Sequence, residues 1–244
     1  MKVRNVLIEF VITVCITSCQ LSTADVAHVK GNLPDAAGIK LILQEMDTKE
    51  IHSIDSVVPD QSGKFSFTPV IMEPGFWLIK DPTGKILVLL VQPGDHVELS
   101  GSVRDFPDQI VMKGPEETML LNDFFRHTRV NERRVDSLEM LLVERQDSSD
   151  YYQLTQKLDT SFRQIWESQR KYEMSYIDTH SGSLASLVVL NYAFGMSPVL
   201  GEEEDFGYYQ KLDSALYKKF PKNKHVKFHH QRVTTHLRKV PGKL

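Results

Sequence analysis

The sequence predicts an α+β protein in which an N-terminal antiparallel β-sandwich is followed by an all-helical region. Two observations predict this order. Between residues 27 and 114, short runs of alternating apolar and polar residues are separated by turns rich in Pro and Gly. Between residues 115 and 240, apolar residues recur three or four positions apart. Strands that precede helices, and do not alternate with them, indicate two segregated layers or domains.

The alternating runs indicate seven or eight short strands in the first region. In Lys64–Thr68 the two phenylalanines fall on one face, and in His96–Ser100 Val97 and Leu99 do the same. Residues 39–44 are a third candidate strand. Residues 85–91, KILVLLV, are apolar at nearly every position, which predicts a central strand covered on both faces. The size of the region suits a sandwich of the immunoglobulin or transthyretin type.

The second region opens at Gly114-Pro115-Glu116-Glu117, where Pro suits the first position of a helix and the carboxylates suit its positive end. A long helix is expected from there. The next helix should cover residues 149–179, where a stripe of apolar residues repeats at a period near 3.6. Three more helices are expected: a buried one over 183–193, one over 203–220 that Pro221 stops, and one over 223–240.

The first eighteen residues have the pattern of a secretory signal, with Lys2 and Arg4 before an apolar run too short to span a membrane. The segment Ile16-Thr17-Ser18-Cys19 resembles a bacterial lipobox. This resemblance implies removal of residues 1–18, acylation of Cys19, and a tether over residues 19–26. The alternative is cleavage after Ala24, where Ser22-Thr23-Ala24 has small residues at the required places, and that cleavage would leave the chain without a lipid.

The lipobox resemblance also predicts where the protein is located. Gln20, and not Asp, follows Cys19, which favours an outer-membrane lipoprotein that faces the periplasm and has membrane lipid as its partner. The chain has two cysteines, Cys15 and Cys19. The first would leave with the signal and the second would carry lipid. No disulfide, redox centre or cysteine nucleophile is then expected in the mature protein, and no cofactor is expected.

The net charge of −3 is unevenly distributed. Nine of the 29 Lys and Arg residues lie between Lys218 and Leu244, where there is no Asp or Glu. Such a segment can contact nucleic acid or anionic lipid. The favoured interpretation is a basic helix that docks on an acidic body, because no basic motif with interleaved aromatic residues is present. We expect no nucleic-acid partner; besides membrane lipid, an unidentified periplasmic protein is a candidate partner.

Three patterns invite a chemical interpretation, and each has a structural alternative. His225, His229 and His236 share one helical face and are weak candidates for a metal site, but no Cys or carboxylate lies near them in the sequence. Residues 201–205 (GEEED) lack the spaced oxygen ligands of a calcium loop and suit a helix start. Phe76 and Trp77 are candidates for stacking on a sugar, although such a pair is more often part of a strand and its core. We predict no metal site and no catalytic residue.

Several stretches resemble a known family. Residues 91–101 (VQPGDHVELSG) and 63–67 (GKFSF), together with the lipobox, resemble the N-terminal domain of unknown function of thioredoxin-like lipoproteins from Gram-negative bacteria. Residues 183–195, 208–226 and 227–233 are similar to the helical middle segment of that family. In the family, a linker similar to residues 241–244 leads into a thioredoxin-like domain with a C-x-x-C centre.

The sequence departs from that family at its end, because no C-x-x-C follows the linker. The resemblance therefore implies a non-catalytic binding or interaction module, the accessory part of a redox lipoprotein, and not an enzyme. The alternative is a fragment of a thiol–disulfide oxidoreductase whose thioredoxin domain is missing from this chain. An open reading frame that resumes with C-x-x-C beyond codon 244 would favour the alternative.

Overall fold

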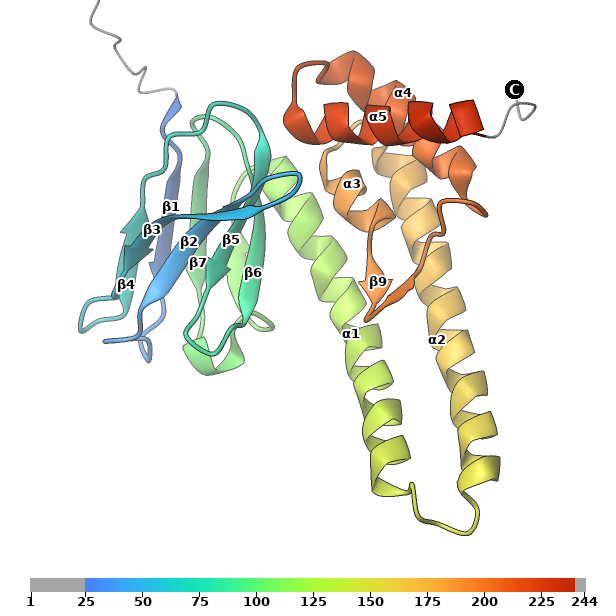
Figure 1. Cartoon of the computed structure of the whole chain (residues 1–244). Helices are drawn as coiled ribbons and strands as arrows, with labels where there is room; N and C mark the ends of the chain where they lie inside the picture. The colour runs from blue at the N-terminus through green and yellow to red at the C-terminus, as the bar shows by residue number, and fades with distance from the viewer. Residues whose placement is uncertain (1–24, 240–244) are drawn as a thin grey trace, which may run out of the picture.

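A computed structural model of the protein describes residues 25–239. In it, eight strands form a sandwich, and five helices follow in a second layer beside it (Figure 1). The predicted α+β class, with strands before helices, is confirmed. The predictions for residues 1–18, for acylated Cys19 and for the linker at 241–244 lie outside the described residues.

Two four-stranded sheets make the sandwich. The first has the order β4-β1-β7-β8, with β1 (His28–Asn32), β4 (Lys64–Phe67), β7 (His96–Ser100) and β8 (Val111–Lys113). The second has the order β3-β2-β5-β6, with β2 (Leu41–Met46), β3 (Ile51–Val57), β5 (Gly75–Lys80) and β6 (Ile86–Val91). Phe65, Phe67, Val97 and Leu99 all point into the core between the sheets, as the alternation predicts.

Two details of the sandwich differ from the prediction. The sheets are not wholly antiparallel, because β1 and β7 pair in parallel, with Val29 opposite Val97. The chain passes through β5 and β6 of the other sheet before β7, so β7 joins β1 by a crossover and not by a hairpin. The apolar strand β6 lies at the edge of its sheet and is not central.

Helices explain why an edge strand is apolar on both faces. Leu87 and Leu89 of β6 point into the sandwich core, while Leu90 belongs to the core of the helical layer. The hydroxyl of Thr118 donates a hydrogen bond of 2.5 Å to the Leu90 carbonyl oxygen. The strand is covered on both faces, as predicted, but the cover on the outer face is the first helix.

Five helices build the second layer: α1 (Glu116–Glu144), α2 (Tyr151–His180), α3 (Ala185–Leu190), α4 (Phe206–Lys219) and α5 (Lys224–Lys239). The helices α1 and α2 form a long antiparallel hairpin, and α3, α4 and α5 gather near one end of it (Figure 1). Within residues 25–239, none of the helices is long and apolar enough to cross a membrane.

The second region is not entirely helical, which corrects the prediction. The buried helix expected over 183–193 ends at Leu190, and the two-residue strands β9 (Ala193–Phe194) and β10 (Ser197–Pro198) form a small hairpin after it. Gly195 takes a positive φ of 57° in the turn, a conformation that Gly adopts without steric cost. Phe194 is buried in a small core with Val135 and Ile165.

Two turn glycines with similar backbone angles should respond differently to substitution by Ala. Gly63 has φ +80°, and a Cβ on it would lie 2.0 Å from the carbonyl oxygen of Leu33. Gly84 has φ +92°, and a Cβ there would meet no atom within 4 Å. We expect Gly84→Ala to cost about 1 kcal/mol from the backbone conformation alone, and Gly63→Ala to cost at least about 1 kcal/mol more. Urea unfolding of both variants measures the difference, and equal losses would contradict it.

Candidate functional site

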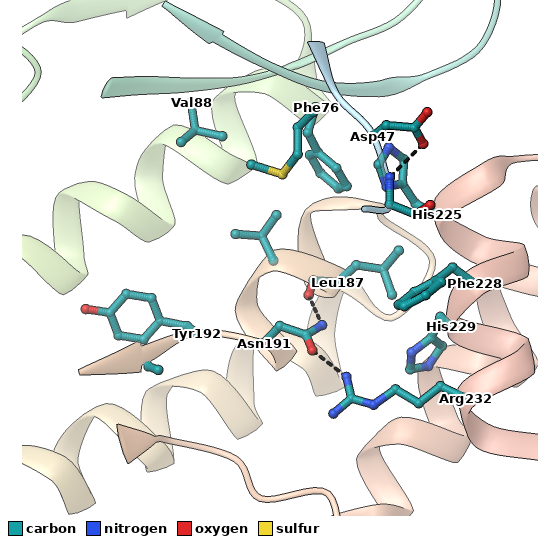
Figure 2. Close-up of a pocket in the computed structure, with 14 residues that line it drawn as sticks. Asp47, Phe76, Val88, Leu187, Asn191, Tyr192, His225, Phe228, His229 and Arg232 are labelled. Atoms are coloured by element: carbon teal, nitrogen blue, oxygen red, sulfur yellow. Dashed lines mark hydrogen bonds between the residues drawn. The ribbon is translucent and has the colours of Figure 1, made fainter. Parts of the chain in front are cut away.

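A groove with a cavity of about 440 Å³ lies where the sandwich meets the helical layer (Figure 2). The sandwich contributes the end of β2 with the turn after it, β5 and β6, and the helical layer contributes α3, the start of β9 and α5. The lining residues are Met46, Asp47, Thr48, Phe76, Val88, Leu187, Val188, Asn191, Tyr192, Ala193, His225, Phe228, His229 and Arg232.

Local sequence patterns place these side chains. His225, Phe228, His229 and Arg232 are spaced at i, i+3, i+4 and i+7, so one face of α5 carries all four. On β5 the neighbours of Phe76 alternate between the two faces of the strand, and Trp77 is in the sandwich core. The outer face of this sheet and one face of α5 thus form opposite walls of the groove.

Most polar groups in the groove are already hydrogen-bonded within the protein. Arg232 donates from Nη1 to Asn191 Oδ1 at 2.7 Å and from Nε to Glu202 Oε2 at 2.6 Å. Asn191 Nδ2 donates to the Leu187 carbonyl oxygen at 2.7 Å. His229 Nε2 lies 2.9 Å from the carbonyl oxygen of Tyr209. The groove therefore offers mainly apolar surface, including the half-exposed ring of Phe228.

His225 is the exception among the polar lining residues. It is 9% exposed, its Nε2 has no hydrogen-bond partner, and its ring meets that of Phe76 edge-on at 4.8 Å between centroids. Burial, together with the neighbouring charge of Lys224, lowers the pKa of His225 to about 4, so the ring is neutral at neutral pH. A neutral imidazole can donate or accept one hydrogen bond at this site.

The three histidines that were weak metal candidates do not come together as a ligand set. His225 packs on Phe76, His229 is bound to Tyr209, and His236 stacks on Phe206 with 4.0 Å between ring centroids. His236 Nδ1 also lies 3.5 Å from a carboxylate oxygen of Glu202. In the described part of the chain, no group of three or more His, Cys, Asp or Glu side chains is placed to hold a metal ion.

The basic C-terminal helix docks on acidic residues, as its charge pattern indicates. Lys224 Nζ lies 2.5 Å from Glu45 Oε1 and 3.8 Å from Asp47 Oδ1, both on the sandwich. His230 Nδ1 lies 2.9 Å from Asp213 of α4. These contacts, with the Arg232–Glu202 pair, hold α5 between the sandwich and the other helices.

The other residues that the sequence suggested as binding candidates include buried rings and residues that form ion pairs within the protein. Phe76 and Trp77 are 4% and 5% exposed, so neither ring is available to stack on a sugar. In the acidic stretch before α4, Asp205 is buried and forms a bidentate pair with Arg170, while Glu202 pairs with Arg232. The Arg170–Asp205 pair was missed because its members lie far apart in the sequence and no local pattern connects them.

A second buried polar group that sequence reasoning missed lies between α1 and α2. Gln169 Nε2 donates to Thr128 Oγ1 and to Glu173 Oε1, each at 3.0 Å, and Asn131 Nδ2 donates to Gln169 Oε1 at 2.9 Å. Glu173 is fully buried, and its Oε2 has no partner. Burial raises the pKa of Glu173 to about 8, so its carboxyl is protonated at neutral pH.

Comparison with known proteins does not assign the chain to a family. No model of a known protein family matches it, and no curated protein matches it significantly.

Proposed function

We propose that this protein is a lipoprotein of the outer membrane, anchored through Cys19 and facing the periplasm, and that its two layers form a non-catalytic binding module. The observation that carries the binding role is the groove between the sandwich and the helices, whose walls come from both layers. Residues 25–239 contain no cysteine, so thiol–disulfide exchange has no reacting group there.

The lining of the groove favours an uncharged, largely apolar ligand. The charge of Arg232 is already neutralised by Glu202, and His225 and His229 are buried rings whose pKa values are lowered by burial. A charged ligand would lose its hydration without gaining an unpaired partner. An apolar ligand would bury surface worth roughly 25 cal/mol per Å².

Filling the groove should abolish ligand binding. We expect the uncharged fluorescent probe N-phenyl-1-naphthylamine to bind the purified protein saturably with one-to-one stoichiometry. Val188→Trp places a large ring in the groove from α3 and should weaken this binding at least about 10-fold, because the ring occupies the space of the probe. Fluorescence titration measures the dissociation constant of the probe for the unchanged protein and for the variant.

Val111→Trp is the matched control, since Val111 is 58% exposed on β8 and is not among the residues that line the groove. Its titration should match that of the unchanged protein. Failure of the probe to saturate, or equal weakening by both substitutions, would remove the binding role. Clear insulin reduction by the purified protein would overturn the non-catalytic part of the proposal. An intact mass that lacks acyl chains on Cys19 would overturn the anchor.

A further inference from the structure

One end of the molecule brings together the start of the described chain, an exposed apolar loop and the corner between α4 and α5. The amide of Ile71 donates to the Asp25 carbonyl oxygen at 2.7 Å, and the amide of Ala27 donates to the Pro69 carbonyl oxygen at 3.0 Å. Asn223 Nδ2 donates to the Pro74 carbonyl oxygen at 2.6 Å. Loop 69–74 therefore links the N-terminal end of the sandwich to the first residues of α5.

This end has exposed apolar side chains. In loop 69–74, Val70 is 43% exposed and Met72 is 78% exposed. Across the corner, Phe228 of α5 is 46% exposed. The ring of Tyr217 on α4 is 40% exposed and stacks on His230. Large apolar side chains that remain exposed on neighbouring segments are typical of a surface that contacts another phase or partner.

The same corner carries unpaired positive charge. Lys218, Lys222 and Lys227 are exposed, and none of them forms an ion pair with another residue in the range 25–239. Glu45 and Asp47 face Lys224, and Glu73 accepts a hydrogen bond from the amide of Lys224, so none of these three carboxylates forms an ion pair with Lys218, Lys222 or Lys227. Docking of α5 thus uses only part of the basic segment.

We infer that this end, formed by loop 69–74 and the exposed faces of α4 and α5, is a surface that lies on an anionic phospholipid bilayer. The inference rests on the proposed anchor. Five residues lie between Cys19 and Asp25, so the six steps from one Cα to the other span at most roughly 20 Å when extended. The lysines would contact lipid phosphates, and Met72 and Val70 would enter the interface between headgroups and acyl chains. The α1–α2 hairpin extends away from this end (Figure 1).

Vesicle binding by the mature chain without its lipid tests the surface separately from the anchor. Residues 19–244 with Cys19→Ser would be sedimented with vesicles of 70% phosphatidylcholine and 30% phosphatidylglycerol, and with pure phosphatidylcholine. We expect binding to the anionic vesicles only, and its loss in high salt. The triple variant Lys218→Glu, Lys222→Glu and Lys227→Glu should bind about 100-fold more weakly, since each lysine near an anionic surface contributes a several-fold gain in affinity.

The control variant reverses three lysines on another surface. Lys30, Lys64 and Lys113 are exposed on the outer face of the β4-β1-β7-β8 sheet, so Lys30→Glu, Lys64→Glu and Lys113→Glu change the net charge equally. We expect this variant to bind within about three-fold of the unchanged protein. Equal losses in the two triple variants, or binding that does not depend on phosphatidylglycerol, would overturn the inference. So would displacement from the vesicles by a DNA duplex at equal phosphate concentration.

A fluorescent label shows which end of the protein faces the vesicle. The Cys19→Ser chain has no other cysteine after residue 19, so Met72→Cys can be labelled alone with an environment-sensitive nitrobenzoxadiazole dye. Its emission should rise and shift to the blue on anionic vesicles. The same label at Met140→Cys, 62% exposed near the far end of α1, should not change. A response at Met140 and none at Met72 would refute this orientation. Loss of the anchor would appear only in the mass of the envelope-extracted protein and would leave these vesicle results unchanged.

Discussion

Arg170→Met should lower the free energy of unfolding by about 3–5 kcal/mol, because it leaves the buried carboxylate of Asp205 without its cation. The Asp205 side chain is 4% exposed, and each of its oxygens accepts a hydrogen bond from one terminal nitrogen of Arg170. Only the amide of Gly201, 2.9 Å from Asp205 Oδ2, would remain as a donor. The pair joins α2 to the start of α4, so its loss affects the packing of two helices.

Urea unfolding at pH 7 measures this loss, and Arg163→Met is the matched control. Arg163 pairs with Asp159 one turn away on the same helix, with side chains 70% and 63% exposed, so its removal should cost no more than about 0.5 kcal/mol. The double variant Arg170→Met with Asp205→Leu should recover much of the lost stability, since no unpaired charge then remains buried. Equal effects of the two Arg substitutions would show that burial of the pair is unimportant.

Glu173→Gln should stabilise the protein at pH 8.5 by about 4–5 kcal/mol and by no more than about 1 kcal/mol at pH 5. Glu173 is fully buried, and burial raises its pKa from 4.5 to about 8. Gln has nearly the same shape, carries no ionisable group, and retains an oxygen that can accept the hydrogen bond from Gln169. The substitution therefore removes the ionisable carboxyl at position 173 and keeps the hydrogen bond from Gln169.

The sign of the pH dependence follows from proton binding. Between pH 4.5 and about 8 the folded state holds a proton on Glu173 that the unfolded state releases. The contribution of this carboxyl to stability is therefore fully present below pH 4.5 and falls as the pH rises toward 8. The difference between Glu173→Gln and the unchanged protein, measured by urea unfolding at pH 5, 6, 7 and 8.5, should grow steadily across this range.

Glu167→Gln is the control for this series, because Glu167 is exposed on the same helix. Its stability difference from the unchanged protein should stay small at every pH. Taking the difference in free energy of unfolding between each variant and the unchanged protein at the same pH cancels the contributions of the other titrating groups. A constant difference for Glu173→Gln over the whole range would mean that Glu173 ionises at its ordinary pKa in the folded state.

Local periodicity was sufficient for most elements of the fold. The stripe over 149–179 predicts a helix that the structure places at Tyr151–His180, because eight turns with one apolar face leave few alternatives. The alternating phenylalanines of β4 and the apolar residues of β7 likewise face the core as predicted. Strand order was less accessible to sequence reasoning. The parallel pairing of β1 with β7 depends on hydrogen bonds between segments that no turn connects.

For the candidate groove too, the sequence predicts which side chains share a helical face but not which segments lie opposite them. The spacing of His225, Phe228 and Arg232 places them on one helical face, but nothing in that spacing identifies Phe76 and Val88 as the opposite wall. For this reason His225, His229 and His236, which share one helical face, do not come together in the structure. Each ring meets a different segment, Phe76, Tyr209 or Phe206, and these segments are distant in the sequence. A helical face specifies which side chains act together but not what they contact.

Four properties of this protein can be recognised from its amino-acid sequence alone: the α+β order, the helical and strand periods, the absence of cysteine after residue 19 and the excess of positive charge near the C-terminus. These properties depend on neighbouring residues, so they can be recognised without a fold. Which charges are paired depends on packing: Lys224 meets Glu45, whereas Lys227 forms no ion pair with any residue from 25 to 239. Burial and pairing depend on segments brought together by packing, and the pKa of Glu173 is set in the same way.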